Sequence, residues 1–258
     1  MSKESKPDTP RERTSPKKPS RKRAEQKRSV ESRSAIIQAA LAEFAEMGFE
    51  GASMRRIGDR SGMHYTLITY HFRTKEALWK AVAEHFFAEI SSIWDESVPA
   101  ASTLDPIDRI REEYRTFLRF ILRFPDFHQF MVRESRTASP RLPWLMDTFI
   151  APVMHRMIPQ IVAAQKEGDL PDANPVLIHY LFIGVTSVLS ALGAEIRYNS
   201  GVDPEDPGVA NQYWRLVDQL AFKRRLYGNS ETEPAALGGS VFEVVRRERE
   251  AVSFPESE

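Results

Sequence analysis

The sequence of 258 residues contains no cysteine. This absence excludes disulfides, thiolate metal sites and a cysteine nucleophile, and it is compatible with a reducing cytoplasm, where we expect the protein to be. The patterns G-x-S-x-G and H-E-x-x-H and the Walker phosphate-binding loop are absent too. Without such a motif no catalytic residue is predicted, and we expect neither enzymatic activity nor a bound cofactor.

Histidine occurs at six positions, but no two of them form an H-x-x-x-H pair. His128, His155 and His179 fall on separate predicted helices and could converge in space. No carboxylates accompany them at the spacing of metal ligands, so no metal site is predicted. The preferred interpretation is that some of these histidines line a small-molecule cavity, in which a few polar groups interrupt an apolar wall.

Long apolar runs are scarce, and residues 176–194 (VLIHYLFIGVTSVLSALGA) form one without a charged side chain. Its length would suffice for a membrane-spanning helix. However, His179, Tyr180 and several hydroxyl residues interrupt it, and its flanks show no clear Lys/Arg asymmetry. A buried helix of a helical bundle is therefore preferred, and no membrane association is expected. A membrane-anchored helical protein is the alternative.

The net charge is zero, but the charges are segregated. Residues 1–30 carry eleven Lys and Arg against four Asp and Glu, a net +7, whereas residues 229–258 carry three against seven, a net −4. Both ends are poor in apolar residues, so we expect a disordered basic arm over residues 1–29 and a mobile acidic tail over residues 229–258. The arm is either a solubilising leader or a contact to DNA phosphates or the minor groove.

Apolar residues between these ends recur with helical spacing, as in Ile37, Leu41 and Phe44. No stretch shows the strict alternation of a strand, so the chain is predicted to be all-α. Residues 53–72 (SMRRIGDRSGMHYTLITYHF) predict two short helices, with Ser53 as the first N-cap and Gly62 in the turn between them. The second helix exposes aromatic, hydroxyl and imidazole groups, which suits the recognition helix of a DNA-binding helix-turn-helix.

The run from Ala35 to Val82 resembles the N-terminal DNA-binding domain of the TetR family of transcriptional regulators. The resemblance rests on the Gly-Phe-x-Gly-x-Ser link at residues 48–53, on Tyr-His-Phe at residues 70–72 and on Lys-Glu-Ala-Leu at residues 75–78. Two positions depart from the family. His64 stands where a capping Ser or Thr is usual, and Thr69 stands where many members carry an aromatic residue or Asn.

The candidate DNA contacts divide by chemistry. Tyr65, Thr66 and Thr69 can touch base edges, through hydrogen bonds or a thymine methyl group. The resemblance implies that Tyr70 and His71 contact the phosphate backbone, although both could instead be packing residues. The full predicted DNA-binding set is Ser53, Arg55, His64, Tyr65, Thr66, Thr69, Tyr70, His71 and Lys75.

The resemblance further implies a DNA-binding domain over residues 30–90 and a larger helical domain over residues 91–228, which binds an effector and dimerises through its last two long helices. A homodimer reads a palindromic operator on double-stranded DNA, with recognition helices about 34–36 Å apart. The predicted function is a repressor that a small, apolar or aromatic effector releases. A DNA-binding regulator or architectural protein without effector control is the alternative.

Met and aromatic side chains are dense in the larger predicted domain, and any one of them could be ordinary core. As a group they are candidates for the wall of an effector pocket. These residues are Phe87, Trp94, Phe117, Phe127, His128, Met131, Trp144, Phe149, Met154 and Phe182.

Overall fold

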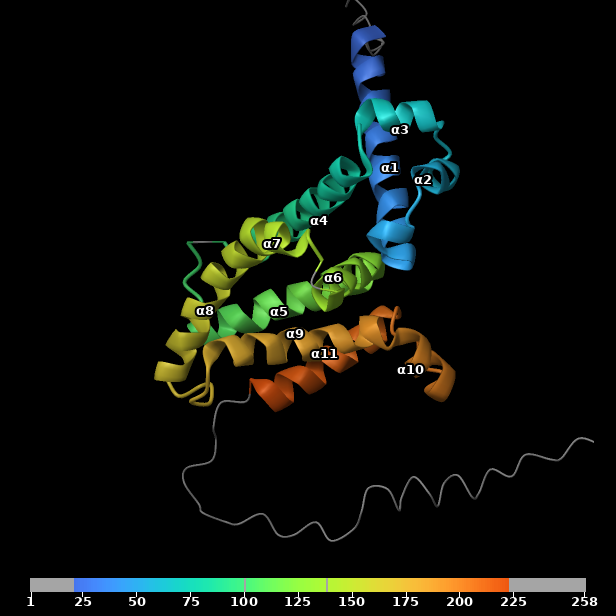
Figure 1. Ribbon diagram of the computed structural model, residues 1–258. Helices are drawn as coiled ribbons and strands as arrows, with labels where there is room; N and C mark the ends of the chain where they lie inside the picture. The colour runs from blue at the N-terminus through green and yellow to red at the C-terminus, as the bar shows by residue number, and fades with distance from the viewer. Residues whose placement is uncertain (1–20, 100, 138, 223–258) are drawn as a thin grey trace, which may run out of the picture. The chain divides into compact units, whose positions relative to one another are not determined.

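The computed structural model describes residues 21–99, 101–137 and 139–222, and within these ranges the chain forms helices and no strand (Figure 1). The predicted acidic tail lies outside the described residues. The elements are α1 (Arg21–Gly51), α2 (Met54–Ser61), α3 (Tyr65–His71), α4 (Lys75–Ser97), α5 (Pro106–Arg123), α6 (Pro125–Thr137), α7 (Leu142–Leu145), the π-helical segment η1 (Met146–Ile150), α8 (Ala151–Lys166), α9 (Pro175–Ala191), α10 (Gly193–Ser200) and α11 (Pro207–Ala221).

The first helix is longer than the sequence predicts. A disordered arm was expected over residues 1–29, but α1 begins at Arg21, so residues 21–29 are helical and residues 1–20 lie outside the described part. At its other end α1 bends at Gly48, whose φ of 70° belongs to the left-handed region. The Phe49 ring then folds back onto Phe44, with ring centroids 6.0 Å apart.

Two breaks interrupt the later helices. Pro152 lies in the first turn of α8, and the chain before it forms π-helical η1 in place of a continuous α-helix. The apolar helix α9 ends at Ala191, and α10 continues from Gly193 at an angle of 58°. Among the described residues no single helix is long and apolar enough to cross a membrane. The bent pair of α9 and α10 meets the length and composition criterion together.

The buried apolar side chains form two clusters. The first joins α1–α3 to α4 and α6, and its centre is the fully buried Trp79, whose ring lies 5.3 Å from that of Phe130. The second joins α5, α8, α9 and α11 around Tyr114 and Phe182. The first cluster therefore extends from the helix-turn-helix into α6. Its buried apolar contacts continue across residue 90, where the DNA-binding domain was predicted to end.

Candidate DNA-binding interface and ligand cavity

A buried carboxylate holds the first helix of the helix-turn-helix. Glu43 on α1 is fully buried, and its Oε1 accepts hydrogen bonds from the Ser53 backbone N–H (3.0 Å) and from Arg56 Nε (2.6 Å). Its Oε2 lies 3.3 Å from Arg60 Nε. Ser53 caps α2 as predicted, because its Oγ accepts from the Arg55 backbone N–H at 3.3 Å. Glu43 thus fixes both the start and one face of α2.

Glycines permit the tight turn between α2 and α3. Gly62 has a φ of 66°, as predicted for this turn. Gly58 lies where a Cβ would come within 2.9 Å of the Met63 carbonyl oxygen and 3.4 Å of Ile68 Cδ1. The absence of a side chain at Gly58 therefore sets how closely α3 packs against α2.

The unusual histidine at the start of the recognition helix is its N-cap. The Nδ1 of His64 accepts from the Thr66 backbone N–H at 3.3 Å and lies 2.8 Å from Thr66 Oγ1. The imidazole therefore replaces the hydroxyl cap that is usual in the family, and α3 begins at Tyr65. Because Nδ1 acts as an acceptor, Nε2 carries the proton.

The cap predicts a clear difference between two substitutions. His64→Ala should destabilise the chain by about 1 kcal/mol and weaken DNA binding, because a free N–H of α3 loses its acceptor. His64→Ser should retain the stability, since the hydroxyl caps the same turn. Thermal unfolding and DNA titration of both variants measure this, and equal losses in the two would contradict capping.

Five of the nine predicted DNA contacts are exposed. Tyr65 and Tyr70 are 52% and 78% exposed, although large aromatic side chains are usually buried. Arg55, His64 and Thr66 are exposed beside them, and Arg55 makes no ion pair within the described ranges. These side chains come from α2, α3 and the turn between them.

Four predicted contacts are less accessible. Ser53, Thr69, His71 and Lys75 are only partly exposed, and the Nε2 of His71 is buried. Thr69 Oγ1 lies 3.0 Å from the Thr66 carbonyl oxygen, to which it donates. The Thr69 hydroxyl proton is thereby committed to its own helix, which leaves its methyl group and an acceptor lone pair for a base edge.

Lys75 has a structural partner that the sequence did not reveal. Its Nζ donates to the carbonyl oxygens of Ala52 (3.2 Å) and Glu50 (3.3 Å), and it lies 4.6 Å above the Phe49 ring. These carbonyls belong to the end of α1 and the link to α2. Lys75 thus ties α4 to that link, in addition to its position at the positive end of α4.

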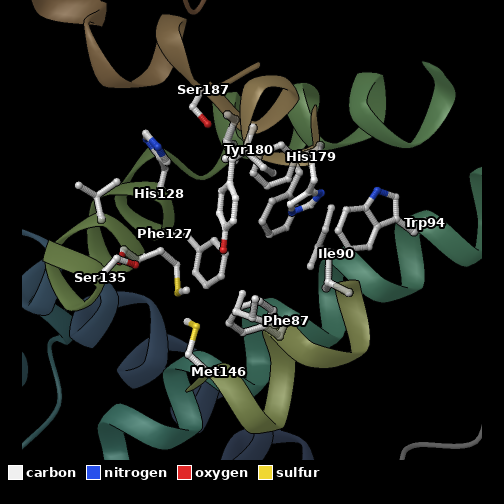
Figure 2. Close-up of a pocket in the computed structure, with 18 of the residues that line it drawn as sticks. Phe87, Ile90, Trp94, Phe127, His128, Ser135, Met146, His179, Tyr180 and Ser187 are labelled. Carbon is white, nitrogen blue, oxygen red and sulfur yellow. The ribbon is translucent and has the colours of Figure 1, made fainter. Parts of the chain in front are cut away.

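The larger helical region contains an apolar cavity of about 280 Å³. Its wall comes from α4, α5, α6, η1, α8 and α9, and Figure 2 shows aromatic rings enclosing the space. Six of the ten predicted pocket residues line it. They are Phe87, Trp94, Phe117, Phe127, His128 and Met131.

The other four predicted pocket residues do not line this cavity. Phe149 stacks behind the wall on Phe87, with ring centroids 4.3 Å apart, and Trp144 packs on Phe149. Phe182 faces the second apolar cluster, where it stacks on Phe222 at 5.0 Å. Met154 is half-buried elsewhere on α8. All four are apolar, and composition alone does not distinguish a cavity wall from the packing behind it.

Wall residues on α9 were only partly predicted. His179, Ile183 and Ser187 recur every fourth residue and face the cavity together. His179 was among the histidines of which some were expected to line a cavity, whereas Ile183 and Ser187 were not named. This spacing was available in the sequence, but the run was interpreted as uniformly buried. His179 Nδ1 lies 2.7 Å from the hydroxyl of Tyr114, which is buried on α5.

Burial keeps the cavity histidines neutral. It lowers the pKa of His128 from its ordinary value of 6.5, and it lowers the pKa of His179 to about 4. His179 is 4% exposed, so the charged imidazolium would lose nearly all contact with water. At pH 7 the wall therefore presents imidazole groups without charge.

The low pKa of His179 predicts acid sensitivity. Above about pH 6.5 the imidazole is neutral in both the folded and the unfolded chain, so it contributes no pH dependence. Between pH 6.5 and about 4 only the unfolded chain takes up the proton, and stability should fall by about 3 kcal/mol. His179→Phe should remove this component. Urea unfolding of both proteins near pH 7 and near pH 4.5 tests it, and parallel losses would contradict it.

Helix α6 connects the cavity to the helix-turn-helix. One face carries His128 and Met131 in the cavity wall. From another face Arg133 Nη2 donates to the Glu46 carbonyl on α1 at 2.6 Å. Beyond α6, the guanidinium carbon of Arg141 lies 3.8 Å from the centre of the Phe49 ring.

These features define an all-α, two-domain protein with an N-terminal DNA-binding helix-turn-helix. Residues 36–82 match the family described as "Bacterial regulatory proteins, tetR family". The sequence is 24% identical to the HTH-type transcriptional regulator RutR of Escherichia coli (strain K12) over 186 residues, which cover 72% of this chain and 86% of RutR. It is 27% identical to the HTH-type transcriptional repressor NicS of Pseudomonas putida over 150 residues, which cover 57% of this chain and 70% of NicS.

Among solved structures, the ketosteroid transcriptional regulator KstR2 of Mycobacterium tuberculosis shares the fold, with a TM-score of 0.59 and 19% identity over 74% of this chain and 95% of KstR2. Residues 36–82 therefore form a TetR-family DNA-binding domain, and the chain is a DNA-binding transcriptional regulator. Because its relatives are regulators, the expectation that it is not an enzyme agrees with the family.

Proposed function

We propose that the protein is a homodimeric repressor that binds a palindromic operator and that a small apolar or aromatic effector releases. Its partners are then double-stranded DNA, a second copy of the chain and a ligand of the cavity. The surface of Tyr65, Thr66 and Thr69 reads base edges, while Arg55 and Tyr70 contact phosphates. Repression follows if the operator overlaps a promoter, because the bound dimer excludes polymerase.

An exposed apolar face on α9 and α11 supports the dimer. Leu177 and Leu181 on α9 are 67% and 65% exposed, and Leu216 and Leu220 on α11 are 51% and 87% exposed. Between the α9 leucines and the helix end lies Gly184, where a Cβ would meet no atom within 4 Å. A contiguous apolar face with a small residue suits close packing of α9 against a second copy.

The observation that carries effector control is the double role of α6. A ligand that displaces His128 or Met131 in the cavity wall would move α6. Arg133, on another face of α6, donates a hydrogen bond to α1 and would transmit this movement. A shift of α6 therefore changes the position of the recognition helix relative to the dimer face. Because binding free energies are linked, operator DNA should weaken effector binding by the same factor as the effector weakens DNA binding.

Selection of bound sequences from a random DNA pool tests this function. We expect a palindrome whose half-sites are centred one helical turn apart or more. Selection with Thr69→Ala should change the preferred base at one position in each half-site. A non-palindromic site would contradict the dimer, and an unchanged preference with uniformly weaker binding would contradict base reading by Thr69.

A further inference from the structure

We infer that the cavity takes an uncharged, mainly apolar molecule with a carbonyl or similar acceptor oxygen, which His179 binds through Nε2–H. The inference rests on the proposed effector function and names the chemical class of the ligand. It follows from the size of the cavity, the charge of its wall and the direction of one hydrogen bond.

The volume and the lining residues of the cavity determine which molecules fit as the main, apolar part of the ligand. A volume of about 280 Å³ is at the small end of ligand pockets and, filled to the density of a protein interior, suits a molecule about as large as a fused two-ring aromatic. Rings of Phe87, Trp94, Phe117 and Phe127 face this space. Aromatic walls favour a flat, apolar body, because ring contacts add to the burial of apolar area.

The Tyr114 hydroxyl fixes the tautomer of His179. Burial raises the pKa of Tyr114, so its hydroxyl keeps the proton and must donate it. Within the described chain its only side-chain hydrogen-bond partner is His179 Nδ1, at 2.7 Å. A buried hydroxyl without an acceptor is costly, so the hydroxyl donates and Nδ1 accepts. The proton of the neutral ring is then on Nε2, which offers a donor to the cavity.

The wall offers no positive charge in its interior. His128 and His179 are both neutral, because burial lowers the pKa of each. Arg136 is the one charged residue of the wall, and its side chain is exposed at the edge. A carboxylate beside His179 would lose its hydration without gaining a cation, which costs several kcal/mol in such an environment, whereas a carbonyl needs one donor.

Ser187 is a second polar residue of the cavity wall. It is 7% exposed, and its hydroxyl has no hydrogen-bond partner among the described residues. It lies two turns after His179 on the same face of α9, and Figure 2 shows both side chains at the cavity with His128 nearby. An unpartnered buried hydroxyl destabilises the free protein.

Calorimetric titration of the full chain with three matched naphthalenes tests the inference. Acetylnaphthalene carries a carbonyl, isopropylnaphthalene replaces it by an isosteric hydrocarbon group, and naphthoate replaces it by a carboxylate. We expect the ketone to bind about fivefold to tenfold more tightly than the hydrocarbon, the value of one hydrogen bond, and about a hundredfold more tightly than the carboxylate.

Two variants assign the preference to the proposed donor. His179→Phe should bring ketone and hydrocarbon to equal affinity while hydrocarbon binding is retained, which also serves as the control for folding. Tyr114→Phe should reduce the ketone preference, because Nδ1–H becomes available as a tautomer. Ser187→Ala should stabilise the free protein slightly, because it removes a buried hydroxyl without a partner.

Several results would overturn the inference. These are equal binding of ketone and hydrocarbon, tighter binding of the carboxylate with dependence on Arg136, and no binding of any of the three. Operator affinity measured with and without saturating ketone distinguishes the proposed effector control from the proposed ligand class. A ketone preference without any change in DNA binding would refute effector control and leave the ligand class standing.

Discussion

Leu181→Glu should convert the protein to a monomer and reduce operator affinity by about a hundredfold or more. Leu181 is 65% exposed in the isolated chain, so a charge there costs little in folding. In the proposed dimer the two glutamates would be buried near each other on α9 without cations. A monomer also loses the gain from binding two half-sites at once, which is typically 10²–10⁴. Analytical ultracentrifugation and DNA titration measure both effects.

Leu104→Glu is the matched control. Leu104 is 46% exposed and precedes α5, so it belongs to neither α9 nor α11. We expect this variant to remain a dimer with unchanged DNA affinity. A dimeric Leu181→Glu protein would refute the α9–α11 interface, and a monomer that binds the operator at full strength would refute the need for two half-sites.

Glu43→Ala should lower the free energy of unfolding by about 3 kcal/mol, which corresponds to about 6–12 °C in Tm for a chain of this size. Removal of the fully buried carboxylate leaves the Ser53 N–H without its acceptor and takes one ion-pair partner from each of Arg56 and Arg60. The loss lies at the lower end for buried ion pairs, because both arginines can reach water. DNA binding should weaken further, since Glu43 positions the start of α2. Thermal unfolding and operator titration check both effects.

Glu46→Ala provides the comparison for Glu43. Glu46 lies one turn away on α1 and pairs with the same Arg60, but its side chain is 59% exposed. Exposed ion pairs contribute at most about 1 kcal/mol, so this variant should be nearly as stable as the native chain. Similar losses in the two variants would contradict the importance of burial at Glu43.

The helix-turn-helix was predictable because its signals are local. Ser53 caps within two residues, Gly62 supplies its own backbone conformation, and the inward positions of Ile57 and Ile68 follow from helical spacing. The cap function of His64 was not predictable from propensity, because imidazole is a rare N-cap. It depends on the ring orientation that brings Nδ1 to the Thr66 N–H.

The cavity was predictable only in part, because its wall depends on how helices rotate against one another. Phe127 and His128 were found by composition, whereas Phe182 on α9 has the same apolar character and faces the other cluster. The partner of Lys75 was missed for the same reason, since the carbonyls of Glu50 and Ala52 lie more than twenty positions earlier. Contacts between distant segments carry no local pattern in the sequence.

The apolar cluster around Trp79 has a consequence for how the chain unfolds. Because Trp79 packs on Phe130, the DNA-binding helices share their core with the helix that lines the cavity. Loss of one part exposes the apolar surface of the other, so we expect the two domains to melt together in one cooperative transition. A cavity ligand should then slow amide hydrogen exchange in α1 and α4 as well as around its own site, because it stabilises the whole unit.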